Sequence, residues 1–310
     1  MTPNIAESIS ILVITYNRPD DLLDFLKSLQ IQENASQIIK EVLILDNAST
    51  ISYDVVKAFI SQNPDLKIQF IESNENLGVA RGRNKLMSVA KGDWLLVLDD
   101  DILFSKPTDL AKIAALPYKE FFANTNTAVF TMRVIYYDTQ EVQVTAFPHK
   151  KYDEYKDKAQ FLTSYYIGCS HLMKRSALDA TGVYPTDFFY GMEEYDLSYR
   201  ILNTGATIAY DGEVTLQHKE SPLGRQPNYK KLQMQWVNKS KVAWRYLPVW
   251  YYLTTAFMWN LQYLKYAKGN LGGYFKAWGL TMMIPFTQKR TAVSSKTLDY
   301  LRKVQARLWY

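Results

Sequence analysis

The sequence predicts an α/β fold in which a mostly parallel sheet is flanked by helices. Four short apolar runs in the first hundred residues are typical of strands buried on both faces. They span residues 9–15, 41–46, 67–73 and 93–99. Segments with apolar residues at helical spacing alternate with these runs, at 19–31, 53–63 and 79–90. Strand and helix in this rhythm predict a parallel sheet with right-handed crossovers.

The composition is that of a packed globular protein. Of the 310 residues, 47% are hydrophobic and 22% are charged, which excludes a disordered chain. Cys169 is the single cysteine, so no intrachain disulfide can form, as is usual in a reducing compartment. The first ten residues have no basic segment, and the apolar run at 9–14 is too short for a signal peptide. We therefore expect a cytoplasmic location.

Polar residues follow each of the four predicted strands. They are Thr15 to Arg18, Asp46 with Asn47, Ser73 to Asn76, and Asp99 to Asp101. In open α/β sheets, ligands bind outside the carboxyl ends of the strands. We therefore expect these polar residues to converge on one site.

The three adjacent carboxylates of Asp99, Asp100 and Asp101 should repel one another unless a cation lies nearby. A hard divalent ion such as Mg²⁺ or Mn²⁺ takes one or two carboxylates and fills its other positions with water and phosphate oxygens. The alternative is an Asp-rich helix start, capped by Asp101 or Ser105. The triplet alone does not separate these two interpretations.

Five segments resemble, in order and spacing, the successive motifs of the family-two inverting glycosyltransferases. They are ISILVITYNRPDDLLDFLKSL, EVLILDNAST, NENLGVARGRNKLM, GDWLLVLDDDI and FFYGMEEYDLSYRILNTGATIAYDGEVTLQHKES. The resemblance covers roughly residues 8–220. It implies the GT-A fold, in which the terminal aspartates of the fourth segment act as a DxD-type motif.

The resemblance also implies roles for individual residues on the donor side. Its nucleotide-sugar site would comprise Thr15, Tyr16, Asn17, Asp46, Arg83, Asp99 and Asp100, and its metal ligands would be Asp101 and His218. Within this set, Asp46 would contact the base and Asp99 would lie near the ribose. Other interpretations stay open, since Tyr16 could fill the core, Arg83 could be a solvated helix residue, and Asp46 could belong to an ordinary turn.

An inverting transfer also needs a base that takes the proton of the acceptor hydroxyl. The family usually has Glu-Asp where this chain has Glu193 and Glu194, with the second residue as the base. We therefore assign Glu194 as the base, reaching one methylene further than aspartate, with Glu193 in support. The alternative is that these acids, with Asp196, only complement the positive end of a helix dipole.

The middle of the chain carries weaker signals. Residues 128–137 and 141–147 are typical of strands, and 150–160 form a charged surface segment. The segment 165–178 resembles the part of the family that lines the acceptor side, with Gly168 and Cys169 at a close approach. Cys169 itself is expected to be a small buried filler.

The predicted organisation is a glycosyltransferase domain over 1–227, with a nucleotide-binding half (1–105) and an acceptor-binding half (106–227), followed by a helical region over 228–310. Segment 244–266 has no charge between Arg245 and Lys265, yet its aromatic residues are spread throughout. This pattern favours a helix lying on a membrane over one spanning it. We expect peripheral contact with the inner leaflet; a buried helical subdomain or a dimer contact is the alternative.

The expected activity is a metal-dependent inverting transfer of a hexosyl or deoxyhexosyl group. The donor would be a UDP- or dTDP-sugar and the acceptor a glycan or a lipid-linked acceptor, in cell-surface polysaccharide or glycolipid synthesis. The basic and aromatic mixture after Lys219 suits a membrane surface better than a nucleic acid. The alternatives are a sugar-nucleotide-forming nucleotidyltransferase, although the loop after the first strand has no glycine, and a catalytically silent membrane-associated scaffold. A homo-oligomer also stays open.

Overall fold

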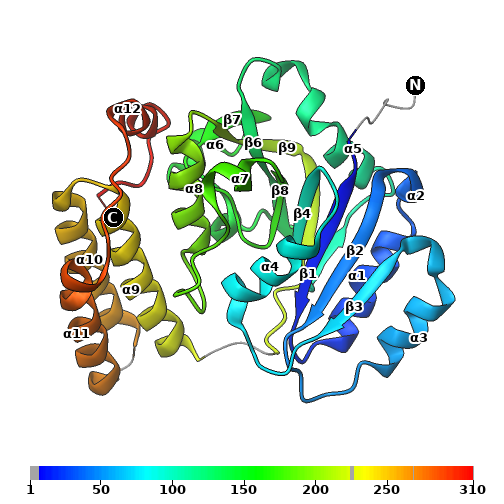
Figure 1. The fold of residues 1–310 in the computed structure, drawn as a ribbon, viewed down its shortest axis with the longest axis horizontal. Helices are drawn as coiled ribbons and strands as arrows, with labels where there is room; N and C mark the ends of the chain where they lie inside the picture. Colours follow the sequence, from blue (N-terminus) through cyan, green and yellow to red (C-terminus); the bar gives the residue numbers. More distant parts are fainter. Residues whose placement is uncertain (1–6, 224–226, 268, 310) are drawn as a thin grey trace.

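A single mixed sheet forms the centre of the computed structural model, which describes residues 7–223, 227–267 and 269–309. The strand order is β3-β2-β1-β4-β8-β6-β9-β5, and β7 pairs with β9 (Figure 1). The strands are β1 (Ile9–Thr15), β2 (Ile39–Asp46), β3 (Ile68–Glu72), β4 (Trp94–Asp99), β5 (Ile102–Phe104), β6 (Thr127–Tyr136), β7 (Gln160–Thr163), β8 (Ser170–Lys174) and β9 (Thr207–His218).

The first half of the sheet is parallel, as predicted. Strand β1 pairs in parallel with β2 and β4, and β2 pairs in parallel with β3. Beyond β4 the sheet becomes mixed, because β8 runs antiparallel to both β4 and β6. The expectation that all four early strands are buried on both faces is wrong for β3, whose residues are half-buried or exposed. The physical reason is that β3 is an edge strand with only β2 beside it.

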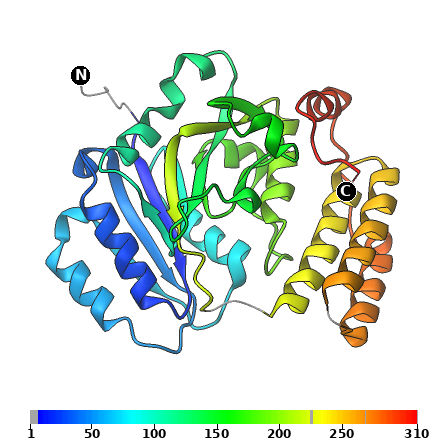
Figure 2. The same ribbon diagram turned by 180° about the vertical axis from the view of Figure 1, so that it is seen from behind.

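Helices cover both faces of this sheet. They are α1 (Pro19–Gln30), α2 (Ala35–Ile38), α3 (Asp54–Gln62), α4 (Gly78–Val89), α5 (Asp109–Ala115), α6 (Tyr152–Tyr155), α7 (Ala177–Thr181), α8 (Glu193–Asn203), α9 (Asn228–Tyr246), α10 (Val249–Tyr266), α11 (Leu271–Thr287) and α12 (Ser295–Lys303). Alternate residues of β1 face opposite ways. Ile11 and Val13 join a core with α1, α3 and α5, whereas Leu12 joins a core with α4, α8 and α9. Helix α4 lies in front of the sheet in Figure 1, and α1 lies in front of it in Figure 2.

The predicted strand over 141–147 is wrong. Only Val142 makes an isolated bridge, to Ile135, and the chain then forms a 3₁₀ turn at Val144–Ala146. The ladder stops because Gln143 is buried and bonds to His218, while Val144 is 53% exposed. The charged segment 150–160 is mostly exposed and contains the short helix α6.

The aromatic segment 244–266 is not one continuous helix. Helix α9 ends at Tyr246, and α10 begins after Pro248, whose ring cannot continue the hydrogen-bonding of the preceding helix. The three long helices α9, α10 and α11 lie side by side at the end of the molecule away from β3 (Figure 1). Among the described helices, none combines the length and apolar character that crossing a membrane requires.

Helix α9 is joined to α8 by a buried ionic contact. The Asp196 carboxylate accepts hydrogen bonds from Arg245 at 2.8 Å, from Tyr246 at 3.0 Å and from Arg200 at 2.8 Å. Asp196 therefore has a structural role between two helices. The predicted domain boundary between residues 227 and 228 stays a prediction. The predicted first domain includes residues 1–6 and 224–226, which lie outside the described residues.

Candidate active site

Two adjoining hollows open beside the carboxyl ends of the parallel strands. The smaller, of about 280 Å³, contains the Asp99–Asp101 triplet and is called here the donor hollow. The larger, of about 720 Å³, contains Glu193 and Glu194 and is called the acceptor hollow. Arg83 and Asp99 line both. Each of the four predicted strand ends contributes at least one polar residue to the smaller hollow, but Asp46, Ser73 and Asn74 line a separate one.

Asp99, Asp101 and His218 form a group that could hold a metal ion. Each offers one ligand atom, and these atoms lie within 4.8 Å of one another. The His218 Nδ1 lies 2.8 Å from the Gln143 amide oxygen, which assigns the proton to Nδ1 and leaves the lone pair on Nε2. Asp101 Oδ1 is buried and accepts no hydrogen bond from any described residue, although His218 Nε2 is 3.2 Å away.

An unbonded carboxylate oxygen facing an unprotonated imidazole nitrogen is a donor set that fits a divalent cation. Without a cation, burial alone would raise the pKa of Asp101, but the proton and positive charge of His218, together with the charge of Arg18, hold it below its ordinary value. A divalent cation would take the place of the proton on Nε2. The sequence alone does not indicate Gln143 as a partner of His218, because the two residues are 75 positions apart and the pattern at 141–147 predicts a strand.

Arg18 supplies the positive charge that the aspartate triplet needs from within the chain. Its Nη1 lies 2.9 Å from Asp100 Oδ1 and 3.2 Å from Asp101 Oδ2. Thr15 donates a further hydrogen bond to Asp100 at 2.7 Å. Burial, opposed by Arg18, raises the pKa of Asp100 to about 7. Asp100 therefore has two protein partners, and its contact with the donor stays a prediction.

Arg83 connects the two hollows. It is 4% exposed, so the interpretation as a solvated helix residue is wrong. Its Nη1 donates to Glu194 Oε1 at 2.8 Å, and its Nη2 donates to Asp99 Oδ1 at 3.0 Å and to the Gly168 carbonyl at 2.8 Å. Burial alone would lower the pKa of Arg83, but Asp99 and the neighbouring acids raise it well above its ordinary value. Arg83 therefore stays charged.

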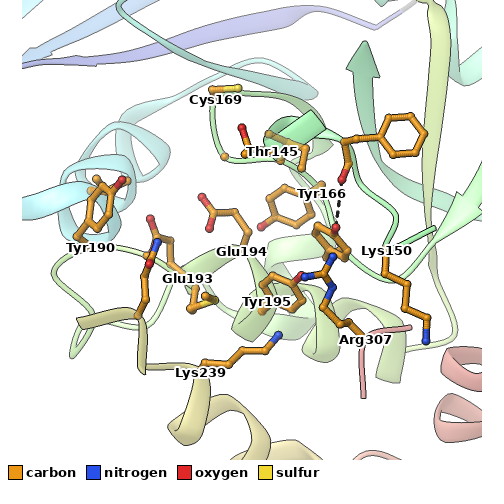
Figure 3. Close-up of a pocket in the computed structure, with 18 of the residues that line it drawn as sticks. Thr145, Lys150, Tyr166, Cys169, Tyr190, Glu193, Glu194, Tyr195, Lys239 and Arg307 are labelled. Atoms are coloured by element: carbon orange, nitrogen blue, oxygen red, sulfur yellow. Dashed lines mark hydrogen bonds between the residues drawn. The ribbon is translucent and has the colours of Figure 1, made fainter. Parts of the chain in front are cut away.

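Glu193 and Glu194 begin helix α8 and differ in environment. The Glu194 side chain is 15% exposed and points toward Cys169 across the acceptor hollow (Figure 3). Glu193 is 2% exposed, and its Oε2 has no hydrogen-bond partner among the residues that the structure describes. Burial, followed by the charge of Glu194, raises the pKa of Glu193 to about 8. Near neutral pH, Glu193 is therefore mostly protonated.

At the carboxyl ends of β1 and β2, some of the polar residues line the donor hollow and others make structural hydrogen bonds. Tyr16 lines the donor hollow. Asn17 instead accepts a hydrogen bond from the Thr50 amide at 2.8 Å. Asp46 accepts one from the Ser49 amide at 2.9 Å and lines a separate hollow. Its neighbour Asn47 is the residue of β2's end that lines the donor hollow.

The cysteine and the two unassigned histidines have structural surroundings. Cys169 is buried, and burial raises the pKa of its thiol well above the ordinary value, as expected for a filler. His171 lies between the Ile167 carbonyl at 2.9 Å and the Tyr184 hydroxyl at 2.9 Å. His149 stacks on the ring of a neighbouring tyrosine at 3.6 Å between centroids.

Comparison with known proteins identifies the family. The model of glycosyl transferase family 2 matches residues 10–182. An uncharacterized protein of Haemophilus influenzae is 28% identical over 181 residues, which cover 57% of this chain and 92% of that protein. The succinoglycan biosynthesis protein ExoO of Rhizobium meliloti is 29% identical over 93 residues, which cover 30% of this chain and 25% of that protein.

A solved structure supports the fold. The mannosyltransferase PcManGT of Pyrobaculum calidifontis, in complex with GDP-Man and Mn²⁺, superposes with a TM-score of 0.60 at 17% identity over 98% of this chain and 81% of that one. This likeness confirms the predicted GT-A architecture. With the family match covering more than half of the sequence, the chain belongs to glycosyl transferase family 2.

Proposed function

We propose that this protein is a metal-dependent inverting glycosyltransferase that uses a nucleotide-diphosphate sugar. The observation that carries this proposal is the shared wall of the two hollows. Asp99 belongs to the candidate metal group and accepts a hydrogen bond from Arg83, which also holds Glu194. A donor in one hollow and an acceptor in the other would meet at this wall.

On the donor side, Asp99, Asp101 and His218 would hold Mn²⁺ or Mg²⁺. The imidazole nitrogen favours Mn²⁺, because Mg²⁺ prefers a shell made only of oxygen ligands. When bound, the cation would offset the negative charge of the departing diphosphate. Arg18 holds Asp101 from the protein side at 3.2 Å and keeps its carboxylate ionised.

On the acceptor side, Glu194 acts as the base. Its carboxylate takes the proton of the acceptor hydroxyl while that oxygen bonds to the anomeric carbon, and the bond from this carbon to the diphosphate oxygen breaks. Attack opposite the leaving group inverts the configuration. Arg83 holds the Glu194 carboxylate in place at 2.8 Å. Protonated Glu193 adds no second negative charge beside it.

The test is donor hydrolysis and transfer, measured over a panel of UDP-, dTDP- and GDP-sugars with and without Mn²⁺. Glu194→Gln should keep donor affinity within about threefold and lower turnover by two or more orders of magnitude, because an amide cannot accept the proton. The panel also separates hexosyl from deoxyhexosyl donors. If the protein neither binds nor turns over any donor in the panel, the proposal is refuted. Normal turnover by Glu194→Gln would refute the assignment of the base.

The acceptor is proposed to be a glycan or a lipid-linked acceptor in cell-surface polysaccharide or glycolipid synthesis. The sequence similarity of 93 residues of this chain to the succinoglycan biosynthesis protein ExoO supports a role in glycan assembly. The chain matches only a quarter of that relative, so the acceptor has to be found by assay. The same panel can be run with candidate acceptors, where acceptor-dependent release of nucleoside diphosphate is the expected signal.

We also propose that helices α10 and α11 contact an anionic membrane surface at the inner leaflet. Large apolar side chains are exposed on them, including Trp250 at 71%, Phe275 at 68% and Phe286 at 83%. Exposed apolar patches of this kind mark interaction surfaces. Cosedimentation with anionic liposomes should fall for Phe286→Ser and stay unchanged for Ile51→Ser, which alters an exposed residue outside these helices. Self-association without liposome binding would favour a dimer contact instead.

A further inference from the structure

Lys239 is a buried lysine whose ammonium faces an aromatic ring. It lies on α9, is 5% exposed, and its Nζ makes no hydrogen bond within the described part of the chain. The ammonium lies 3.4 Å from the centroid of the Tyr195 ring. This contact with an aromatic face stabilises a cation only in part. Lys239 also lines the acceptor hollow, so a ligand in that hollow can reach it.

Two further cations line the same hollow. They are Arg307, in the segment after α12, and Lys150, in the segment before α6. Lys150 and the C-terminal segment are held together, because the Lys150 ammonium donates to the Ala306 carbonyl at 3.2 Å. Three segments that are distant in the sequence therefore deliver positive charge to one hollow.

The two glutamates of the acceptor hollow, Glu193 and Glu194, lie near Arg83 and away from Lys239 and Arg307. Glu194 is 2.8 Å and Glu193 is 3.9 Å from Arg83 Nη1. In Figure 3 the Glu194 carboxylate points toward Cys169, whereas Lys239 and Arg307 lie beyond Tyr195 on the opposite side. Burial, followed by the charge of Arg307, lowers the pKa of Lys239 to about 7. Near neutral pH, Lys239 is therefore about half protonated by itself, and an anion beside it would favour its charged form.

We infer that Lys239, Arg307 and Lys150 bind a phosphate group of the acceptor. This inference rests on the proposed glycosyltransferase function. A neutral sugar would leave the Lys239 charge unpaired, whereas a phosphate supplies two negative charges and several acceptor oxygens. Arginine is well suited to such a group because its planar guanidinium can bind two oxygens at once.

The position of this phosphate site relative to Glu194 fits a phosphorylated acceptor. Tyr195, over which the Lys239 ammonium lies, directly follows Glu194 in α8. The Tyr195 ring also stacks on Tyr165, with 4.5 Å between the centroids. An acceptor that placed its phosphate at Lys239 would therefore have to extend past Tyr195, both of whose ring faces are covered, to bring a neighbouring sugar to the base. The donor diphosphate has its own hollow, which Lys239 does not line.

The test is calorimetric binding of soluble probes to the full chain. Glucose 1-phosphate should bind at least tenfold more tightly than methyl glucoside, its neutral analogue. Lys239→Met and Arg307→Met should each weaken phosphate binding at least tenfold. The control Lys230→Met, which removes an exposed cation on the same helix, should stay within twofold of wild type.

Folding of the variants is measured in parallel. Lys239→Met keeps an apolar stem and removes a buried charge, so its thermal midpoint should equal or exceed that of wild type. Arg307 is exposed, and its variant serves as a second test that cannot fail through loss of core packing. Equal binding of the phosphate and the neutral probe, or unchanged binding by both variants, would overturn the inference.

A second probe, farnesyl diphosphate, separates two sources of the phosphate. Tighter Lys239-dependent binding of farnesyl diphosphate indicates a lipid-linked acceptor, and tighter binding of glucose 1-phosphate indicates a phosphorylated saccharide. Both results support phosphate recognition. Donor turnover without Lys239-dependent binding overturns this inference alone. Lys239-dependent binding in a chain that neither binds nor hydrolyses any donor overturns the proposed function instead.

Discussion

Replacing Gly168 by alanine should inactivate the protein while leaving it folded. A Cβ at Gly168 would overlap Oε1 of Glu194, and it would lie 3.0 Å from the Glu194 Cδ and 3.4 Å from Arg83 Nη1. Carbon atoms in contact prefer about 3.5–4.0 Å, so the Glu194 carboxylate must move by roughly 0.5–1 Å or more. The obstacle is the flexible end of a side chain, and Arg83 also donates to Asp99 and to the Gly168 carbonyl, so the cost in folding free energy should be about 1–3 kcal/mol.

The same movement of the Glu194 carboxylate should slow the reaction. It breaks the 2.8 Å contact between Arg83 and Glu194 and displaces the proposed base from the acceptor hydroxyl. A misplacement of about 1 Å can lower a rate on the order of 100-fold. This corresponds to about 2.7 kcal/mol of lost transition-state stabilisation. The loss should appear in kcat, whereas donor affinity should change little, because Asp101 and His218 are not touched.

The assay is steady-state transfer with the preferred donor, combined with donor binding and urea unfolding. Gly279→Ala is the matched control. A Cβ there meets nothing within 4 Å, and the residue lies inside helix α11, where alanine is favoured by roughly 1 kcal/mol over glycine. The control should keep full activity. Wild-type turnover by Gly168→Ala would refute the geometric argument, and so would a loss of donor binding as large as the loss of turnover.

Two further predictions concern the metal group and the buried acid. Gln143→Leu removes the acceptor that fixes the His218 ring, so we expect Mn²⁺ affinity to fall 10- to 100-fold in a calorimetric titration; unchanged affinity would show that His218 is not a ligand oriented in this way. Glu193→Gln should remove a pH dependence of stability. The pKa of Glu193 is raised to about 8 by burial, so between its unfolded value of 4.5 and pH 8 the folded chain binds the extra proton, and stability falls as pH rises. From pH 5.5 to 7.5, the advantage of the variant over wild type in urea unfolding should grow by about 2 kcal/mol, at up to about 1.4 kcal/mol per pH unit; parallel curves would contradict the assigned burial.

Local patterns predicted the parallel half of the fold well. The apolar runs at 9–15 and 93–99 became β1 and β4 almost residue for residue, because a buried strand needs an uninterrupted apolar sequence. The pattern misled at 141–147, where valines alternate as in a strand. There the buried amide of Gln143 bonds to His218, a partner that no local window contains.

The sequence by itself predicted the family, the fold and two members of the candidate metal group, Asp101 and His218, because motif order is a property of the chain alone. Asp99, which was expected near the ribose, joins this group only in the tertiary structure. Only the tertiary structure revealed that Arg18 neutralises the aspartate triplet and that Lys239 and Arg307 line the acceptor hollow. These contacts depend on which segments the folded sheet and helices bring together. The sequence shows that a lysine stands at position 239, whereas its burial against the Tyr195 ring arises only when distant elements pack around it.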